Sequence, residues 1–114
     1  MLPVPMLEIR YYVASDRRQP FAAWFSDLAP VERAKVTRAI ARLEQGNVSN
    51  VKSVGEGVLE VRIDFGPGYR VYFGRDGEAL VILLTGGTKK RQQRDIDAAH
   101  VCWQDYKERK RGRR

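Results

Sequence analysis

The sequence predicts an α+β fold in which helices pack on one face of a small antiparallel sheet, and three observations support this. Residues 58–84 contain three stretches of strand character joined by two turn sequences. Residues 20–45 contain two segments with helical spacing of apolar residues, and a third segment follows residue 94. The expected order is therefore β-α-α-β-β-β-α. No repeat or linker interrupts it, so we expect one domain over 1–106 and a basic tail over 107–114.

The first third of the chain predicts one strand and two helices. Residues 8–13 (EIRYYV) are expected to form a strand beside the later hairpin. Pro20 suits a first helical position, and the apolar residues after it recur at helical spacing until Pro30 interrupts them. A second helix is expected from there to Gln45, followed by a polar loop over 47–57. Its outer side carries Arg33, Lys35, Arg38 and Arg42, for which we favour a solvated face over a phosphate-binding ridge.

Residues 58–73 predict a β-hairpin with one apolar and one polar face. Apolar side chains from Leu59 to Phe65 alternate with Glu60, Arg62 and Asp64, and a Gly-Pro-Gly turn follows. A three-residue loop over 66–68 would place Arg70 opposite Asp64 and Tyr72 opposite Arg62 on the polar face. Such cross-strand pairing would stabilise the hairpin.

The last third predicts a buried strand, a basic loop and a helix. Asp76-Gly77 is a strong turn signal, and the continuous apolar run over 79–84 is typical of a strand covered on both faces. We expect Gly86-Gly87 to lead the chain out of the sheet and to display Lys89 and Lys90. A helix is expected from residue 94 or 95, with an inner side made by Ile96, Ala99, Trp103 and Tyr106.

Charge and composition narrow the class of partner. The chain has a net charge of +7, and its last eight residues hold six of the 21 basic and one of the 14 acidic residues. Such a tail attracts nucleic acid without sequence preference, although a solvated helix end is an equal alternative. A single cysteine and a single histidine exclude an internal disulfide and a His-rich metal site. Apolar runs are too short to cross a membrane, so we expect a cytoplasmic protein. We expect no cofactor.

Three segments resemble the RelE/ParE toxin superfamily, in particular the HigB-like, phage-related addiction module killer proteins. They are LEVRIDFGPGYRVYF (59–73), ILLTGGTKKRQQRDIDAA (82–99) and the Trp-containing helix, and the resemblance extends over 7–106. It implies the toxin of a bacterial type II toxin-antitoxin system, with a helix-turn-helix antitoxin as partner and operator DNA bound by the complex. RelE-like and HigB-like members cut messenger RNA on the ribosome without a metal and so inhibit translation. ParE-like members inhibit DNA gyrase instead.

The resemblance also assigns site residues one by one. The arginine that contacts the scissile phosphate corresponds to Arg70, and the basic residue of the preceding strand corresponds to Arg62. The basic residue after the last strand corresponds to Lys89 or Lys90. A second lysine of RelE-like enzymes falls on Glu60, which departs from the pattern, and a C-terminal tyrosine has no match.

The residue types fit RNA cleavage by its own 2′-hydroxyl. Arg62 and Arg70 suit the developing phosphorane charge, since guanidinium groups bind phosphate through two parallel hydrogen bonds. Glu60 is a candidate general base, and Lys89 or Lys90 a candidate proton donor to the leaving oxygen. For RNA binding, Tyr72 would stack on a base and Arg91 and Arg94 would contact phosphates. A gyrase inhibitor and a simple nucleic-acid-binding module that acts through its tail remain alternatives.

Overall fold

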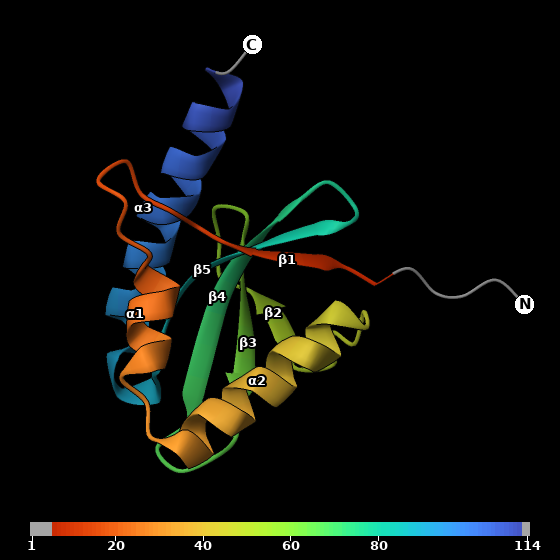
Figure 1. Ribbon diagram of the computed structural model, residues 1–114, viewed down its shortest axis with the longest axis vertical. Helices are drawn as coiled ribbons and strands as arrows, with labels where there is room; N and C mark the ends of the chain where they lie inside the picture. Colours follow the sequence, from red (N-terminus) through yellow and green to blue (C-terminus); the bar gives the residue numbers. More distant parts are fainter. Residues whose placement is uncertain (1–5, 113–114) are drawn as a thin grey trace, which may run out of the picture.

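The computed structural model describes residues 6–112, which fold around one five-stranded mixed sheet and confirm the α+β class (Figure 1). The strands are β1 (Glu8–Tyr11), β2 (Val51–Ser53), β3 (Val58–Ile63), β4 (Tyr69–Asp76) and β5 (Leu80–Thr88). The helices are α1 (Pro20–Ser26), α2 (Pro30–Glu44) and α3 (Gln92–Arg111), with a 3-10 turn η1 (Lys89–Arg91) before α3. In space the strand order is β1-β5-β4-β3-β2.

The helices cover both faces of the sheet, so the expectation that they pack on one face is wrong. On one face α1 and α2 bury Phe21, Val36 and Leu43 against apolar side chains of β3, β4 and β5. On the other face α3 buries Ala99 and Trp103 against a second set that includes Tyr72. The physical reason is that β4 and β5 carry apolar residues on both faces, and each face needs a cover.

The order of elements and the sheet type also differ from the prediction. A short strand, β2, forms within the expected loop over 47–57 and pairs antiparallel with β3. Only three residues long, it is too short to leave an alternating pattern in the sequence. β1 pairs with β5 in parallel, so the sheet is mixed rather than antiparallel. The two helices between β1 and the hairpin provide the crossover that parallel pairing requires.

The β3–β4 hairpin has a different register from the expected one. Ile63 pairs with Tyr69 and Arg62 with Arg70, so the connection is five residues long rather than three. Gly66 and Gly68 both have positive φ, 55° and 81°, which allows the wider turn. A shift of two residues keeps every side chain on its predicted face but changes its cross-strand partner.

The two glycines of β5 lie inside the strand and do not end it, which corrects the predicted exit from the sheet. A Cβ atom on Gly86 would lie 2.3 Å from the Trp24 ring, and one on Gly87 would lie 1.8 Å from Oδ2 of Asp95. Trp24 belongs to α1 and Asp95 to α3. The glycines therefore let helices approach the same strand closely from its two faces.

Helix α3 starts at Gln92, two residues before the earlier of its two predicted starts, and continues through Arg111. Its predicted inner side is confirmed, because Ala99 and Trp103 are buried and Ile96 and Tyr106 pack beside them. The first five residues of the basic segment, 107–111, are the last turns of this helix. Among residues 6–112, no helix is long and apolar enough to cross a membrane.

Candidate functional site

Two arginines from neighbouring strands form the centre of the candidate site. Arg62 on β3 lies directly opposite Arg70 on β4. Each has its own carboxylate: Arg62 Nε is 3.4 Å from Oδ1 of Asp64, and Arg70 Nε is 3.7 Å from Oε1 of Glu60. The predicted Asp64–Arg70 and Arg62–Tyr72 pairs are therefore wrong, because the wider turn moves the register by two residues.

The two arginines differ sharply in exposure. The side chain of Arg62 is 54% exposed, whereas that of Arg70 is 9% exposed and that of Glu60 is 1% exposed. Arg62 thus meets solvent at the surface, and the Arg70–Glu60 pair lies below it. Lys52 of β2 stands at the rim, with Nζ 3.8 Å from Oε1 of Glu60.

Beneath this surface lies a buried polar cluster made of Glu60, Arg70, Tyr72 and Asp95. Each of the four has one buried polar atom without a hydrogen-bond partner of standard geometry. These atoms are Oε1 of Glu60, Nε of Arg70, the hydroxyl oxygen of Tyr72 and Oδ2 of Asp95. Gln92, in the first turn of α3, donates from Nε2 to Oε2 of Glu60 at 2.9 Å. Unsatisfied groups of this kind are rare in folded proteins, and each calls for a structural or functional explanation.

Burial sets the proton affinities in the cluster. It raises the pKa of the Tyr72 hydroxyl far above its usual range, and the neighbouring carboxylates of Glu60 and Asp95 add to that rise. Burial also raises the pKa of the Asp95 carboxyl, against the opposing charges of Arg91 and Arg94. Tyr72 therefore stays protonated at neutral pH, and Asp95 retains its proton to a higher pH than an ordinary aspartate.

Tyr72 does not provide the predicted stacking surface, because its side chain is completely buried under α3. The alternation of β4 correctly put Tyr72 on the same face as Arg70. That face, however, is covered by a helix and is not open to solvent, which the pattern within the strand did not reveal.

The loop after β5 brings a lysine to the same place. The Lys89 backbone N–H donates to the Gly68 carbonyl at 3.0 Å. A Cβ atom on Gly68 would lie 3.5 Å from both Arg70 Nη1 and Lys89 Cβ, so these two residues are neighbours. The backbone and Cβ of Lys89 thus lie beside Arg70.

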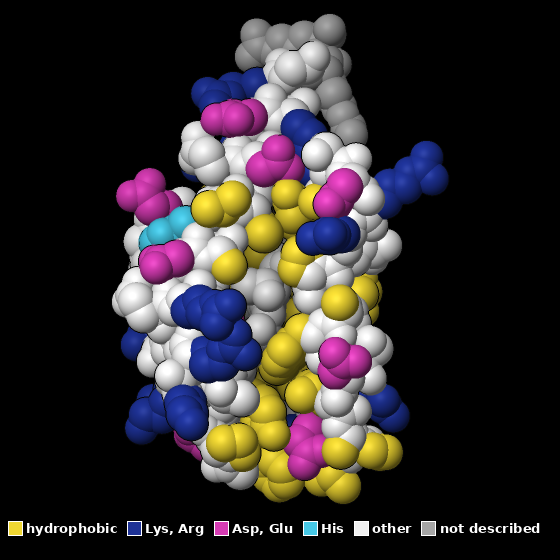
Figure 2. Space-filling model, turned by 90° about the vertical axis from the view of Figure 1, so that its left-hand side faces the viewer, with side chains coloured by type: hydrophobic (Ala, Val, Ile, Leu, Met, Phe, Trp, Pro, Cys, Tyr) yellow, Lys and Arg dark blue, Asp and Glu magenta, His cyan; other side chains and the backbone are white. Residues whose placement is uncertain are grey.

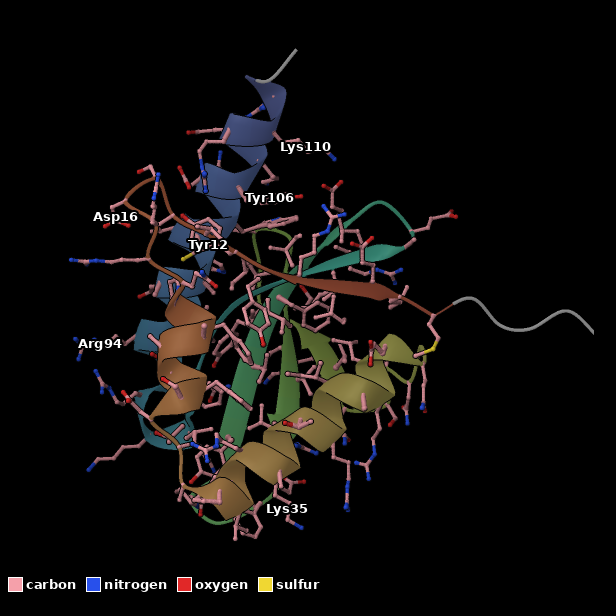
Figure 3. All side chains as sticks on the ribbon, in the orientation of Figure 1. Tyr12, Asp16, Lys35, Arg94, Tyr106 and Lys110 are labelled. Atoms are coloured by element: carbon pink, nitrogen blue, oxygen red, sulfur yellow. The ribbon has the colours of Figure 1, made fainter. Side chains whose placement is uncertain are left out.

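The remaining predicted cations form an exposed surface next to this point. Lys90 and Arg91 lie on η1 and Arg94 on the first turn of α3, and all three are exposed. Arg94 points away from the fold (Figure 3). Figure 2 shows Lys and Arg side chains gathered on the lower half of one face, beside a strip of hydrophobic side chains.

The structure thus unites Arg62, Arg70, Glu60 and Lys89, and it adds three residues that the sequence interpretation missed. Lys52 and Gln92 contact Glu60, and Asp95 fills the space left by Gly87. A sequence signal existed only for Asp95, since a glycine in a strand often marks a close approach. Within residues 6–112, no three His, Cys, Asp or Glu side chains are grouped so as to hold a metal ion.

Comparison with known proteins identifies a family and a relative. Residues 23–102 match the family model of the phage-derived Gp49-like proteins. The chain is also 44% identical over 86 residues to an uncharacterized protein of Haemophilus influenzae, a match that covers 75% of this chain and 87% of the relative.

Proposed function

The chain belongs to the Gp49-like family of phage-derived proteins, and we propose that it is the toxin of a type II toxin-antitoxin module that cleaves messenger RNA on the ribosome. Family membership is compatible with a toxin. The cleavage mechanism and the RelE-like, HigB-like assignment belong to the proposal.

The observation that carries the proposal is the meeting of Arg62, Arg70 and Lys89. Two come from adjacent strands in direct register, and the third is placed by a backbone hydrogen bond to the hairpin turn. Both arginines pair with a carboxylate, so a phosphate would compete with Asp64 and Glu60 for guanidinium groups that bind phosphate through parallel hydrogen bonds. Lys90, Arg91 and Arg94 are exposed on η1 and the first turn of α3, where they would contact further phosphates of the RNA.

Each step of cleavage by the 2′-hydroxyl has a candidate group. Arg62 and Arg70 stabilise the charge of the phosphorane, because guanidinium donors match its oxygens. Lys89 protonates the leaving 5′-oxygen, with Lys90 as the neighbouring alternative. Glu60 is the candidate acceptor of the 2′-hydroxyl proton, and its Oε2 accepts a hydrogen bond from Gln92 Nε2.

A cognate antitoxin is expected as a partner, because an unrestrained messenger-RNA nuclease would arrest its own host. We propose a helix-turn-helix protein encoded beside the toxin, which forms with it a complex that binds operator DNA. Its binding would cover or distort the surface that carries Arg62 and Arg70.

One observation favours a second candidate, a non-catalytic inhibitor of DNA gyrase. Arg70 and Glu60 are almost wholly buried, so the proposed catalytic pair is not open to substrate in the arrangement seen. A protein-directed inhibitor would need only the exposed surface, including Arg62 and the α3 cations.

Induced expression in bacteria distinguishes the two candidates. RNA 5′ ends and gyrase-linked DNA breaks are mapped together for the wild-type chain, for Arg62→Ala and for a control, Arg18→Ala, which changes an exposed arginine on a distant loop. The nuclease is supported if translated messages are cut in frame by the wild-type chain and by Arg18→Ala but not by Arg62→Ala. Breaks in DNA without such cuts support the inhibitor and overturn the first proposal.

A further inference from the structure

A second basic surface lies on the face of the sheet covered by α1 and α2. A groove of about 290 Å³ runs between α2 and β3, and the connection to β2 closes one side of it. We call it the α2 groove. Its walls carry four cations and one carboxylate, namely Lys35, Arg38, Arg42, Arg62 and Asp64.

The three cations of α2 lack acidic partners. Lys35, Arg38 and Arg42 are three and four residues apart, so they share one side of the helix, and Figure 3 shows Lys35 at its lower edge. Within residues 6–112 none of them forms an ion pair, although Arg10, Arg109 and other surface cations do. The unrelieved repulsion among them favours an anionic ligand.

The lining of the α2 groove indicates what kind of anion it fits. The apolar residues at its floor, Leu43, Val61 and Ile63, are only 2%, 7% and 8% exposed, so they offer little surface to an apolar side chain. Phe65 has the Lys35 ammonium 5.0 Å from its ring centre. The other lining groups are the polar Asn47, Ser49 and Asn50 and two apolar side chains, Ala39 and Val51, which are partly buried against the core. An amphipathic protein segment needs apolar contact, whereas a nucleic-acid backbone needs cations and hydrogen-bonding groups.

We propose that the α2 groove binds the phosphodiester backbone of an RNA strand, away from the phosphate that reacts at Arg70. The choice of RNA over DNA rests on the proposed function. Lys35 and Arg42 are seven residues apart on the helix, a rise of about 10 Å, so the row of cations can contact more than one phosphate of a strand. Arg62 lines the α2 groove and lies opposite Arg70 in the β3–β4 register. The α2 groove and the candidate site therefore adjoin at Arg62, and one RNA strand could contact both.

The test measures binding of the full chain to a fluorescein-labelled, single-stranded RNA of about 12 nucleotides, 2′-O-methylated so that it cannot be cleaved. The groove variant is Arg38→Glu/Arg42→Glu, which avoids Arg62 and the Lys35–Phe65 contact. The matched control is Arg17→Glu/Arg18→Glu, an equal change in charge at exposed residues of the loop before α1. Fluorescence anisotropy is followed across a salt series.

The groove variant is expected to weaken binding at least about tenfold relative to the control. The slope of log binding constant against log salt concentration should fall in magnitude by about 1.4. Two phosphate contacts are lost, and each contact to a single strand contributes about 0.7. Circular dichroism checks folding, and Arg38→Ala/Arg42→Ala replaces the variant if it fails to fold. Equal affinities and slopes for the groove and control variants overturn the inference.

Two further outcomes separate this inference from the proposed function. If the groove variant binds RNA like the control but loses the protein encoded beside it, the groove is a protein-docking surface and the inference is wrong. If the uncleavable RNA is bound through the groove but no message is cut in cells, the inference stands and the nuclease proposal fails.

Discussion

The Nε atom of Arg70 lies 3.7 Å from Oε1 of Glu60, and both side chains are almost completely buried between β3, β4 and the start of α3. Removal of either partner leaves a buried charge without its counter-ion. We therefore expect Glu60→Ala to lower the free energy of unfolding by about 3–5 kcal/mol. Urea unfolding measures this, with Asp64→Ala as the control because Asp64 is 77% exposed. Equal stability of the two variants would contradict the role of the pair.

Arg62 allows a cleaner test of activity than Arg70, because its exposed side chain contributes little to the core. Arg62→Ala should retain the wild-type melting temperature. It should lose about 3 kcal/mol of transition-state stabilisation, on the order of a hundredfold in cleavage rate. Growth arrest at matched protein levels is the readout, with Arg18→Ala as control. Arrest as fast as wild type would show that Arg62 is not part of the site.

Asp95 should make stability depend on pH in a defined direction. Burial raises the pKa of its carboxyl in the folded state, so ionised Asp95 destabilises the fold. This loss of stability is absent when the pH is below 3.8, the ordinary pKa of an aspartate. It grows as the pH rises through the folded-state pKa of Asp95 and is complete above that pKa. Asp95→Asn should therefore be more stable than wild type at neutral pH but not at about pH 3.

Thermal melts at the two pH values measure this difference. Asp97→Asn is the matched control, since Asp97 is exposed on the same helix and accepts a hydrogen bond from Gln93. The interpretation fails if Asp95→Asn has no greater effect at neutral pH than at acidic pH.

The end of α3 is expected to contribute to stability, unlike a tail outside the domain. Lys110 pairs with Asp76, Arg109 donates to the Val13 carbonyl, and Arg109 Nε lies 2.9 Å from Oδ2 of Asp105. Deletion of residues 107–114 should therefore lower the free energy of unfolding by about 1–2 kcal/mol, a value reduced by the solvent exposure of the cations. Deletion of residues 112–114 keeps all three contacts and serves as the control in the same melts. Identical melting temperatures for the two deletions would show that these contacts are negligible.

Gly86 should not tolerate a side chain. A Cβ atom there would lie 2.3 Å from the Trp24 ring, so Gly86→Ala has to displace α1 and should cost about 1–3 kcal/mol. Gly112→Ala is the control, because its Cβ would make only ordinary contacts, the nearest at 3.6 Å. Denaturant unfolding compares them, and a neutral effect of Gly86→Ala would mean that α1 packs less closely than described.

The sequence alone determined the elements whose signals are local. Apolar spacing located α1, α2 and the inner side of α3, and strict alternation assigned Glu60, Arg62 and Arg70 to one face of the hairpin. Basic residues after the last strand were also identified by position. These signals depend on neighbours in the chain, so no tertiary contact is needed to see them.

Only the tertiary structure decided which of these residues meet and which reach solvent. The turn takes five residues rather than three, a choice made by the pairing of whole strands, and it sets Arg62 opposite Arg70. Helix α3 crosses the polar face of the hairpin, because the apolar residues of β4 and β5 on that side need a cover. This burial changes Tyr72 from an expected stacking surface into a core residue and brings Asp95 against Gly87. Such long-range packing depends on the total apolar area buried by distant segments, which no local pattern in the chain records.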